Sequence, residues 1–219
     1  KFVSITNLSV FKTSSTISEE YFGVNEHRRN SIENSSNTDY LIFLDSDIHF
    51  NKDLLKIHKK HYDTISKKYE FFILTPQYTK LWDNTWDELV NTKFLNKARN
   101  EIKPNVVNDI YGDMGLREIR NFKWAGGWFT GISGSLAKKI SIPKSFVGYG
   151  PDDTFMMECC KILKQKKINV IQYCIRGMIV YEQNSFKQTS LREDIPTFRK
   201  NCNQVFYREL NAFTKSLNI

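Results

Sequence analysis

The feature that most constrains this chain is a run of apolar residues that ends in two acids. Tyr40-Leu-Ile-Phe-Leu44 is apolar throughout, and Asp45-Ser46-Asp47 follows it directly. A short apolar run with polar segments on both sides predicts a β-strand that helices cover on both faces. Open α/β sheets bind their ligands beyond the carboxyl ends of such strands. The sequence therefore predicts two carboxylates at the edge of a ligand crevice.

Apolar patterns in the rest of the chain predict an alternation of strands and helices around this strand. Apolar spacing predicts helices over residues 26–34, 51–69, 82–99 and 151–167, and strands over residues 1–5, 71–74 and 169–175. Pro76 is expected to stop the second of these strands, and residues 103–121 to form an irregular loop. The alternation predicts a mainly parallel, Rossmann-type sheet flanked by helices.

Composition narrows the class of protein. The chain has 219 residues with 40% apolar content, enough for one globular domain, and no apolar run approaches the roughly 18 residues of a membrane span. The net charge of +8 favours anionic partners, but the lysines are dispersed, so a phosphate-bearing small molecule is preferred to nucleic acid.

The four cysteines and two of the histidines are not expected to have catalytic or metal-binding roles. Four cysteines lack metal-binding spacing and are expected to be buried and reduced, which suits a cytoplasmic protein, including one at the membrane surface. His58 and His61 fall on the apolar side of their helix and are expected to pack in the core.

The acids after the first strand have two interpretations. Asp45 and Asp47, with a small Ser46 between them, provide oxygen ligands for a divalent cation that also bridges phosphate oxygens. Alternatively, one acid caps the following turn and the other is solvated. Because the pattern is short, only other parts of the chain can decide between them.

Two later segments add to this candidate site. Residues 124–134 combine four glycines with Trp128 and other aromatic residues, a composition suited to stacking on a sugar or to a turn with a buried core. Gly148-Tyr-Gly-Pro-Asp-Asp153 opens a helix, with Gly150 as its expected cap. Acidic residues are favourable in the first turn of a helix because of the helix dipole. Asp152 and Asp153 therefore have a purely structural explanation as well as a functional one. Glu182 follows apolar residues near a strand end, facing either the crevice or solvent.

Taken in order, these motifs resemble the nucleotide-sugar-dependent glycosyltransferases of the GT-A fold. The resemblance runs from about Arg29 to Tyr207. Arg29-Asn30 is similar to the family's Arg-Asn helix, and the strand ending in Asp45 and Asp47 is similar to its metal-binding D-x-D. The segment 148–153 is similar to the family's Trp-Gly-Gly-Glu-Asp motif.

The resemblance implies a role for each candidate residue. In inverting galactosyltransferases and chondroitin-type polymerases the second acid of the Glu-Asp pair is the catalytic base, which maps to Asp153. Asp152 stands where the family has a Glu that holds the acceptor hydroxyl. The remaining implied roles are acceptor binding by Gly127, Trp128 and Tyr149, donor binding by Arg28, Arg29 and Asp45, and binding of Mn²⁺ or Mg²⁺ by Asp45, Asp47 and Glu182.

The expected protein is thus a single glycosyltransferase domain over residues 1–219, with a donor and metal half (1–75) and an acceptor and catalytic half (76–219). It would transfer a hexose or N-acetylhexosamine from a nucleoside diphosphate sugar to a glycan hydroxyl, with inversion at the anomeric carbon. A UDP-sugar is the first expected donor, and the expected process is polysaccharide biosynthesis. The alternatives are a retaining transferase on the same fold, a metal-dependent phosphodiesterase or nucleic-acid-binding protein, and a catalytically inactive lectin-like descendant.

Two departures from the family qualify these expectations. Glu182 stands where the family often has a metal-binding His. The family's first strand and helix, which hold the nucleobase, are not intact in the sequence. We expect either that this βα unit is missing ahead of Lys1 or that the nucleotide pocket is built differently.

Overall fold

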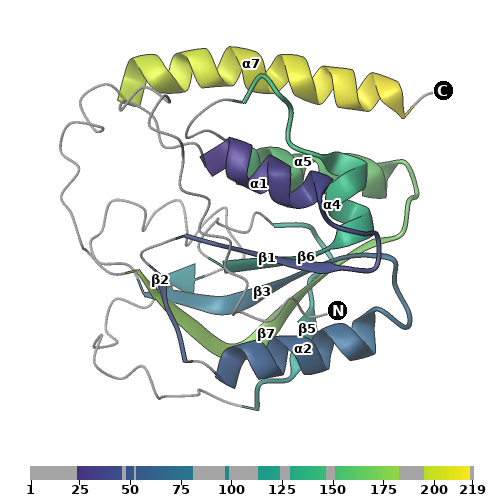
Figure 1. Cartoon of the computed structure of the whole chain (residues 1–219), viewed down its shortest axis with the longest axis vertical. Coiled ribbons are helices and arrows are strands. Elements are labelled where there is room, and N and C mark those ends of the chain that lie inside the picture. The colour runs from purple at the N-terminus through teal and green to yellow at the C-terminus, as the bar shows by residue number, and fades with distance from the viewer. Residues whose placement is uncertain are drawn as a thin grey trace.

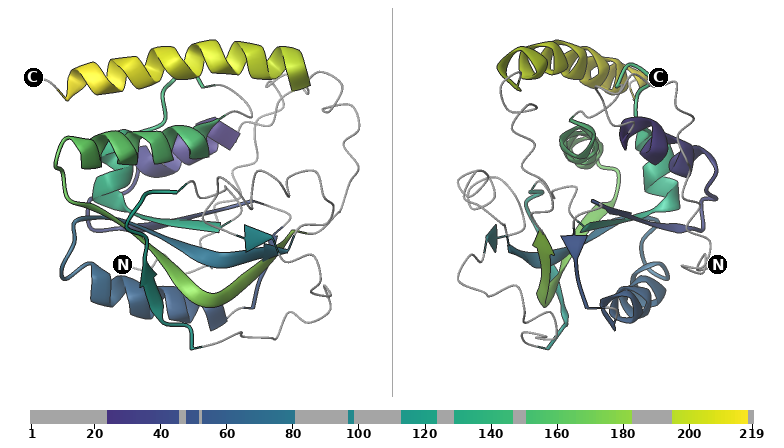
Figure 2. Two further views of the ribbon diagram at one scale, coloured as in Figure 1. Left: turned by 180° about the vertical axis from the view of Figure 1, so that it is seen from behind. Right: turned by 60° about the vertical axis from the view of Figure 1, so that its left-hand side comes forward.

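A β-sheet lies between helices on both of its faces (Figure 1). The computed structural model describes residues 24–45, 48–51, 53–80, 97–98, 113–123, 129–146, 151–182 and 195–217. One face of the sheet carries α1 (Val24–Glu33), α4 (Gly134–Ile140) and α5 (Asp152–Gln165), with α7 (Ile195–Ser216) lying over them, and the other face carries α2 (Asp53–Ile65). Figure 2 shows the same layers from two further sides. The predicted α/β class with flanking helices is confirmed.

The sheet is mixed, which corrects the prediction of a mainly parallel one. Its main strands are β1 (Tyr40–Leu44), β6 (Phe129–Ser133), β3 (Phe71–Lys80), β7 (Val170–Glu182) and β2 (Ile48–His49), in that spatial order. β6 pairs antiparallel with both β1 and β3, whereas β3 and β7 are parallel. The reason is that β6 begins beside Leu44, at the carboxyl end of β1, and returns across the sheet to enter α4.

The shared direction of three strands positions the candidate site. Because β6 is antiparallel to both β1 and β3, and β7 is parallel to β3, the strands β1, β3 and β7 all run the same way. Their last residues are Leu44, Lys80 and Glu182, so these strands end toward one edge of the sheet. Asp45 follows at this edge.

The two faces of the sheet bury two apolar clusters. Along β3, Phe72 and Leu74 belong to the cluster under α2, whereas Ile73 belongs to the cluster beneath α4 and α5. This alternation is the period of two that a pleated strand requires. Both clusters are made of large apolar side chains with almost no exposure, so each helical layer is attached to the sheet by burial of apolar area.

Several predicted elements differ in extent. β3 continues through Pro76, and a pairing irregularity between Pro76 and Tyr78 accommodates the missing N–H. β7 continues through Gly177, whose positive φ of 75° favours glycine and whose N–H donates to the Gln77 side chain. Two short strands, β4 (Lys97–Ala98) and β5 (Leu116–Glu118), replace parts of a predicted helix and a predicted loop. The strand predicted over residues 1–5 lies outside the described residues.

The helix α2 and His58 agree with the sequence, whereas His61 is only half-buried, with its Nε2 2.7 Å from the Met114 carbonyl oxygen. Asn51 caps this helix, since its side-chain oxygen accepts from the Asp53 N–H at 2.9 Å. His58 is fully buried, and its Nδ1 lies 3.0 Å from the Tyr40 hydroxyl. Burial lowers the pKa of His58 to about 3, so this imidazole is a neutral core residue at physiological pH.

Cys159, Cys160 and Cys174 are buried free thiols, as expected, and Cys202 lies outside the described side chains. Among the helices of the described ranges, none combines the length and apolar character needed to cross a bilayer.

Gly134, the first residue of α4, packs closely against the backbone of the segment that precedes β1. A Cβ at this position would lie 2.2 Å from the Ser36 carbonyl oxygen and 2.9 Å from that of Asp39, both backbone atoms. We predict that Gly134→Ala lowers the free energy of unfolding by at least about 2 kcal/mol in urea denaturation, because no side-chain movement relieves the overlap.

Gly115→Ala is the matched control. A Cβ there would meet chiefly the Arg176 guanidinium, the far end of an exposed and flexible side chain. Its cost should stay below about 0.5 kcal/mol. Equal losses in the two variants would contradict the proposed role of close backbone contact at Gly134.

Candidate functional site

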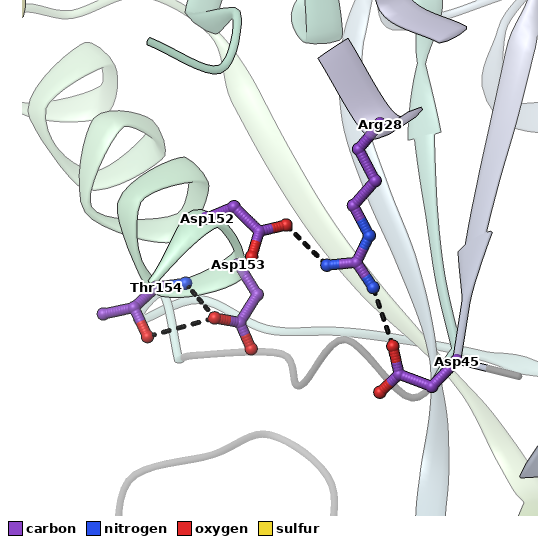
Figure 3. A network of polar contacts seen from close by, with 5 residues as sticks. All are labelled: Arg28, Asp45, Asp152, Asp153 and Thr154. Carbon is purple, nitrogen blue, oxygen red and sulfur yellow. Dashed lines mark hydrogen bonds and ion pairs between the residues drawn. The ribbon is translucent and has the colours of Figure 1, made fainter. Parts of the chain in front are cut away.

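Arg28 joins the two parts of the predicted site (Figure 3). Its side chain extends from α1 between the end of β1 and the start of α5. Nη2 donates to Asp45 Oδ1 at 2.8 Å, and Nη1 donates to Asp152 Oδ2 at 2.5 Å. Acids from two motifs that are distant in the sequence are therefore held by one guanidinium. Planar guanidinium groups suit this task because their donors form a rigid fork.

Burial differs between the two ends of this bridge. The side chains of Arg28 and Asp152 are 10% and 5% exposed, whereas that of Asp45 is 36% exposed. The pair with Asp152 is thus inside the protein, and Asp45 is where the bridge meets solvent. A ligand arriving from solvent would encounter Asp45 first.

The helix start of α5 positions the second acid. Pro151 is the N-cap, one residue later than predicted, so Asp152 and Asp153 occupy the first turn, as expected. Asp153 Oδ1 accepts from the backbone N–H of Thr154 at 2.6 Å and from the Thr154 hydroxyl at 3.3 Å. These contacts orient the Asp153 carboxyl beside the Arg28 bridge (Figure 3).

Three carboxyl groups, those of Asp45, Asp152 and Asp153, act electrostatically on the guanidinium of Arg28. Burial alone would lower the pKa of Arg28, but the charges of Asp152 and Asp45 outweigh it and raise that pKa above the ordinary value. Arg28 is therefore a permanent cation among these acids.

Asp153 is an acid with a raised pKa at this site. Burial and the neighbouring charge of Asp152 raise the pKa of Asp153 to about 6, although Arg28 and the Thr154 N–H favour the ionised form. A carboxyl with a pKa near 6 can accept a proton close to neutral pH more readily than an ordinary surface acid. The arrangement can thus supply a general base.

Glu182 lies at the same edge of the sheet. It is the last residue of β7 and pairs with Ile48 in β2, whose N–H donates to the Asp45 carbonyl at 3.2 Å. Glu182 is half-buried, and its Oε2 is shielded from solvent. The sequence left open whether Glu182 faces the crevice or solvent, and its pairing with Ile48 places its backbone beside β2.

Within the described ranges, no group of three or more His, Cys, Asp or Glu side chains is placed to hold a metal ion. Asp47, the second acid of the D-x-D, lies outside those ranges, as do Gly127, Trp128 and Tyr149. Their assigned roles stay predictions.

Arg29 has a different set of contacts from Arg28. Its Nε donates to the Ile142 carbonyl at 3.0 Å, and its Nη2 donates to those of Pro143 and Phe146 at 2.9 and 2.7 Å. These bonds anchor the segment after α4 to α1. The sequence assigned Arg29 to donor binding, and nothing in its pattern indicated that three backbone carbonyls would converge on it.

Comparisons with protein-family models, curated proteins and solved structures gave no match to this chain. The site must be interpreted from its own geometry.

Removal of Arg28 should destabilise the fold. We predict that Arg28→Gln lowers the free energy of unfolding by about 2–3 kcal/mol at pH 7, because Asp152 is left buried without its cation. Urea denaturation of the two proteins measures the effect.

Lys56→Gln is the control, since Lys56 and Asp53 form an exposed pair on α2. Its effect should be below about 0.5 kcal/mol. A loss in Arg28→Gln no greater than in this control would show that the bridge does not hold β1 and α5 together.

The raised pKa of Asp153 predicts that Asp153→Asn stabilises the fold, whereas Arg28→Gln destabilises it. Since its pKa is near 6 in the folded chain and 3.8 ordinarily, the folded state binds more protons between these values, and stability falls as pH rises through this range. Asp153→Asn removes that charge while keeping an oxygen for Thr154. We therefore predict a gain on the order of 1–3 kcal/mol at pH 7, decreasing to little at pH 4.

Thermal or urea unfolding of both proteins from pH 4 to pH 8 measures the difference. A variant that is less stable than the natural chain at pH 7 would contradict the assigned pKa.

Proposed function

We propose that this chain is a glycosyltransferase that transfers a sugar, with inversion, from a nucleoside diphosphate sugar to a glycan hydroxyl. The observation that carries the proposal is the Arg28 bridge, because it brings the acid at the end of β1 together with the acids that begin α5. The mixed sheet with helices on both faces is compatible with a GT-A fold. UDP-sugars are the first donors to test.

Asp153 is the proposed catalytic base. The acceptor hydroxyl would bind beside its carboxylate, and Asp153 would take the hydroxyl proton as the oxygen attacks the anomeric carbon. The bond between that carbon and the diphosphate breaks at the same time, from the opposite face of the sugar. A carboxylate with a pKa near 6 is mostly ionised at neutral pH and is a stronger base than an ordinary aspartate.

Asp152 and Arg28 support this base by position and charge. Asp152 precedes Asp153 in the first turn of α5 and is held by Arg28 Nη1. We propose that this ion pair fixes the helix start against β1, so the base keeps its distance from the donor edge. In this proposal Arg28 acts through the acids, and the diphosphate contact that the sequence assigned to it is secondary.

A divalent cation belongs to the proposal through the acids at the sheet edge. Asp45 and Glu182 offer only carboxylate oxygens, the donors that Mn²⁺ and Mg²⁺ prefer, and Asp47 would have to complete the set. When bound, such an ion would neutralise charge on the leaving diphosphate. The partial exposure of Asp45 fits a residue that meets an incoming ligand.

The wider assignments follow from this reaction. The partners would be a nucleotide sugar and a glycan, with no nucleic acid, and the pathway class would be polysaccharide biosynthesis. We propose a cytoplasmic location, including peripheral association with the membrane surface.

Ligand-dependent stabilisation tests the proposal. We predict that at least one nucleotide sugar raises the melting temperature in the presence of Mn²⁺ and that omission of the metal abolishes the effect. NMR of the product linkage would then distinguish inversion from retention. Stabilisation by DNA, without any response to nucleotides, would favour the phosphodiesterase or nucleic-acid alternative.

Asp153→Asn separates catalysis from binding. It should lower transfer by at least about 10²-fold, because an amide cannot accept the hydroxyl proton, while donor binding changes little. In the natural chain the rate should rise with pH through about 6, as Asp153 ionises. Transfer by the variant at the natural rate would remove Asp153 from this role.

A further inference from the structure

Asn25, in the first turn of α1, has a buried side-chain amide that forms no hydrogen bond within the described part of the chain. It is 0% exposed, and within the described part of the chain neither its Oδ1 nor its Nδ2 has a hydrogen-bond partner. Buried polar groups are nearly always paired, since an unpaired one loses its hydration without compensation. An apolar residue would serve the interior better at this position.

The helix places this amide on the same face as Arg28. Asn25 lies in the first turn of α1, three residues before Arg28, a spacing that puts two side chains on one side of a helix. From that face, Arg28 extends to Asp45 and Asp152 (Figure 3). Both residues are buried, so Asn25 lies on the same buried face of α1 as the arginine that holds the site acids.

We infer that the Asn25 amide is a further ligand-binding group of this site, taking a group that presents a hydrogen-bond donor and acceptor side by side. Vicinal sugar hydroxyls and the imide edge of a pyrimidine base have this chemistry, which matches the one acceptor and two donors of an amide. The ligand class rests on the proposed function, whereas the unpaired amide does not. Because Asn25 is covered in the free chain, binding must displace whatever now covers it.

A leucine at this position tests the inference through opposite effects on stability and binding. Leucine has the same number and branching of side-chain heavy atoms and no polar atoms. If the amide is kept for a ligand, Asn25→Leu should raise the melting temperature by about 2–6 °C, since two unpaired polar atoms are removed. A fall in melting temperature would overturn the inference, because it would mean that the amide is satisfied inside the fold, for example by a buried water.

Binding is the second measurement. Calorimetric titration with UDP, with a panel of UDP-sugars and with a candidate acceptor sugar, each in Mn²⁺, should show affinity reduced at least about tenfold in Asn25→Leu. A loss already present with UDP assigns the amide to the nucleotide, and a loss confined to one sugar assigns it to that sugar. Unchanged affinity for every probe that the natural chain binds would overturn the inference.

Asn34→Leu is the matched control, because Asn34 is an exposed residue that follows α1 and bonds only locally, to the Asn30 carbonyl. It should leave all affinities unchanged. Asn25→Ala repeats the affinity test without the bulk of leucine, and it should lose the same affinity as Asn25→Leu. A natural chain that binds no probe would overturn the proposed function and the ligand class stated here, and a stability gain in Asn25→Leu would still identify the amide as a group retained at a cost to folding.

Discussion

One guanidinium holds the candidate site together. Arg28 contacts Asp45 at the end of β1 and Asp152 at the start of α5, and thereby connects the strand edge to the helical layer. Apolar packing attaches each helix to the sheet, but such packing is not directional and tolerates small shifts. Two charge-assisted hydrogen bonds from a rigid fork define distance and orientation more narrowly. The geometry of the acids therefore depends on this interaction.

The same interaction gathers acids of like charge at the start of α5. Burial and the neighbouring charge of Asp152 raise the pKa of Asp153. Asn25 adds buried polar atoms on the same face of α1. Both features work against stability, and proteins commonly keep such features where a ligand or a reaction requires them. The site is thus distinguished by its energetic cost as well as by its residue types.

Sequence patterns predicted the elements better than their arrangement. The strand over Tyr40–Leu44 and the helix starts near Asn51 and Asp152 were confirmed because they depend on local spacing and capping. The predicted burial of that strand was wrong, since β1 is an edge strand of the described sheet and Leu44 is exposed. The predicted strand directions were wrong. Alternation of strands and helices along the chain does not reveal that β6 runs antiparallel between β1 and β3. The passage of β3 through Pro76 also depends on its pairing with β7, a contact distant in sequence.

The sequence by itself determined the α/β class, the residue types at the site and the location of each acid at the end of a strand or the start of a helix. Only the tertiary structure decided that Arg28 joins those acids while the adjacent Arg29 anchors backbone carbonyls. The two arginines are equivalent in charge and neighbouring in sequence. Their roles diverge because successive residues of a helix point about 100° apart, toward different neighbours that only the folded chain assembles.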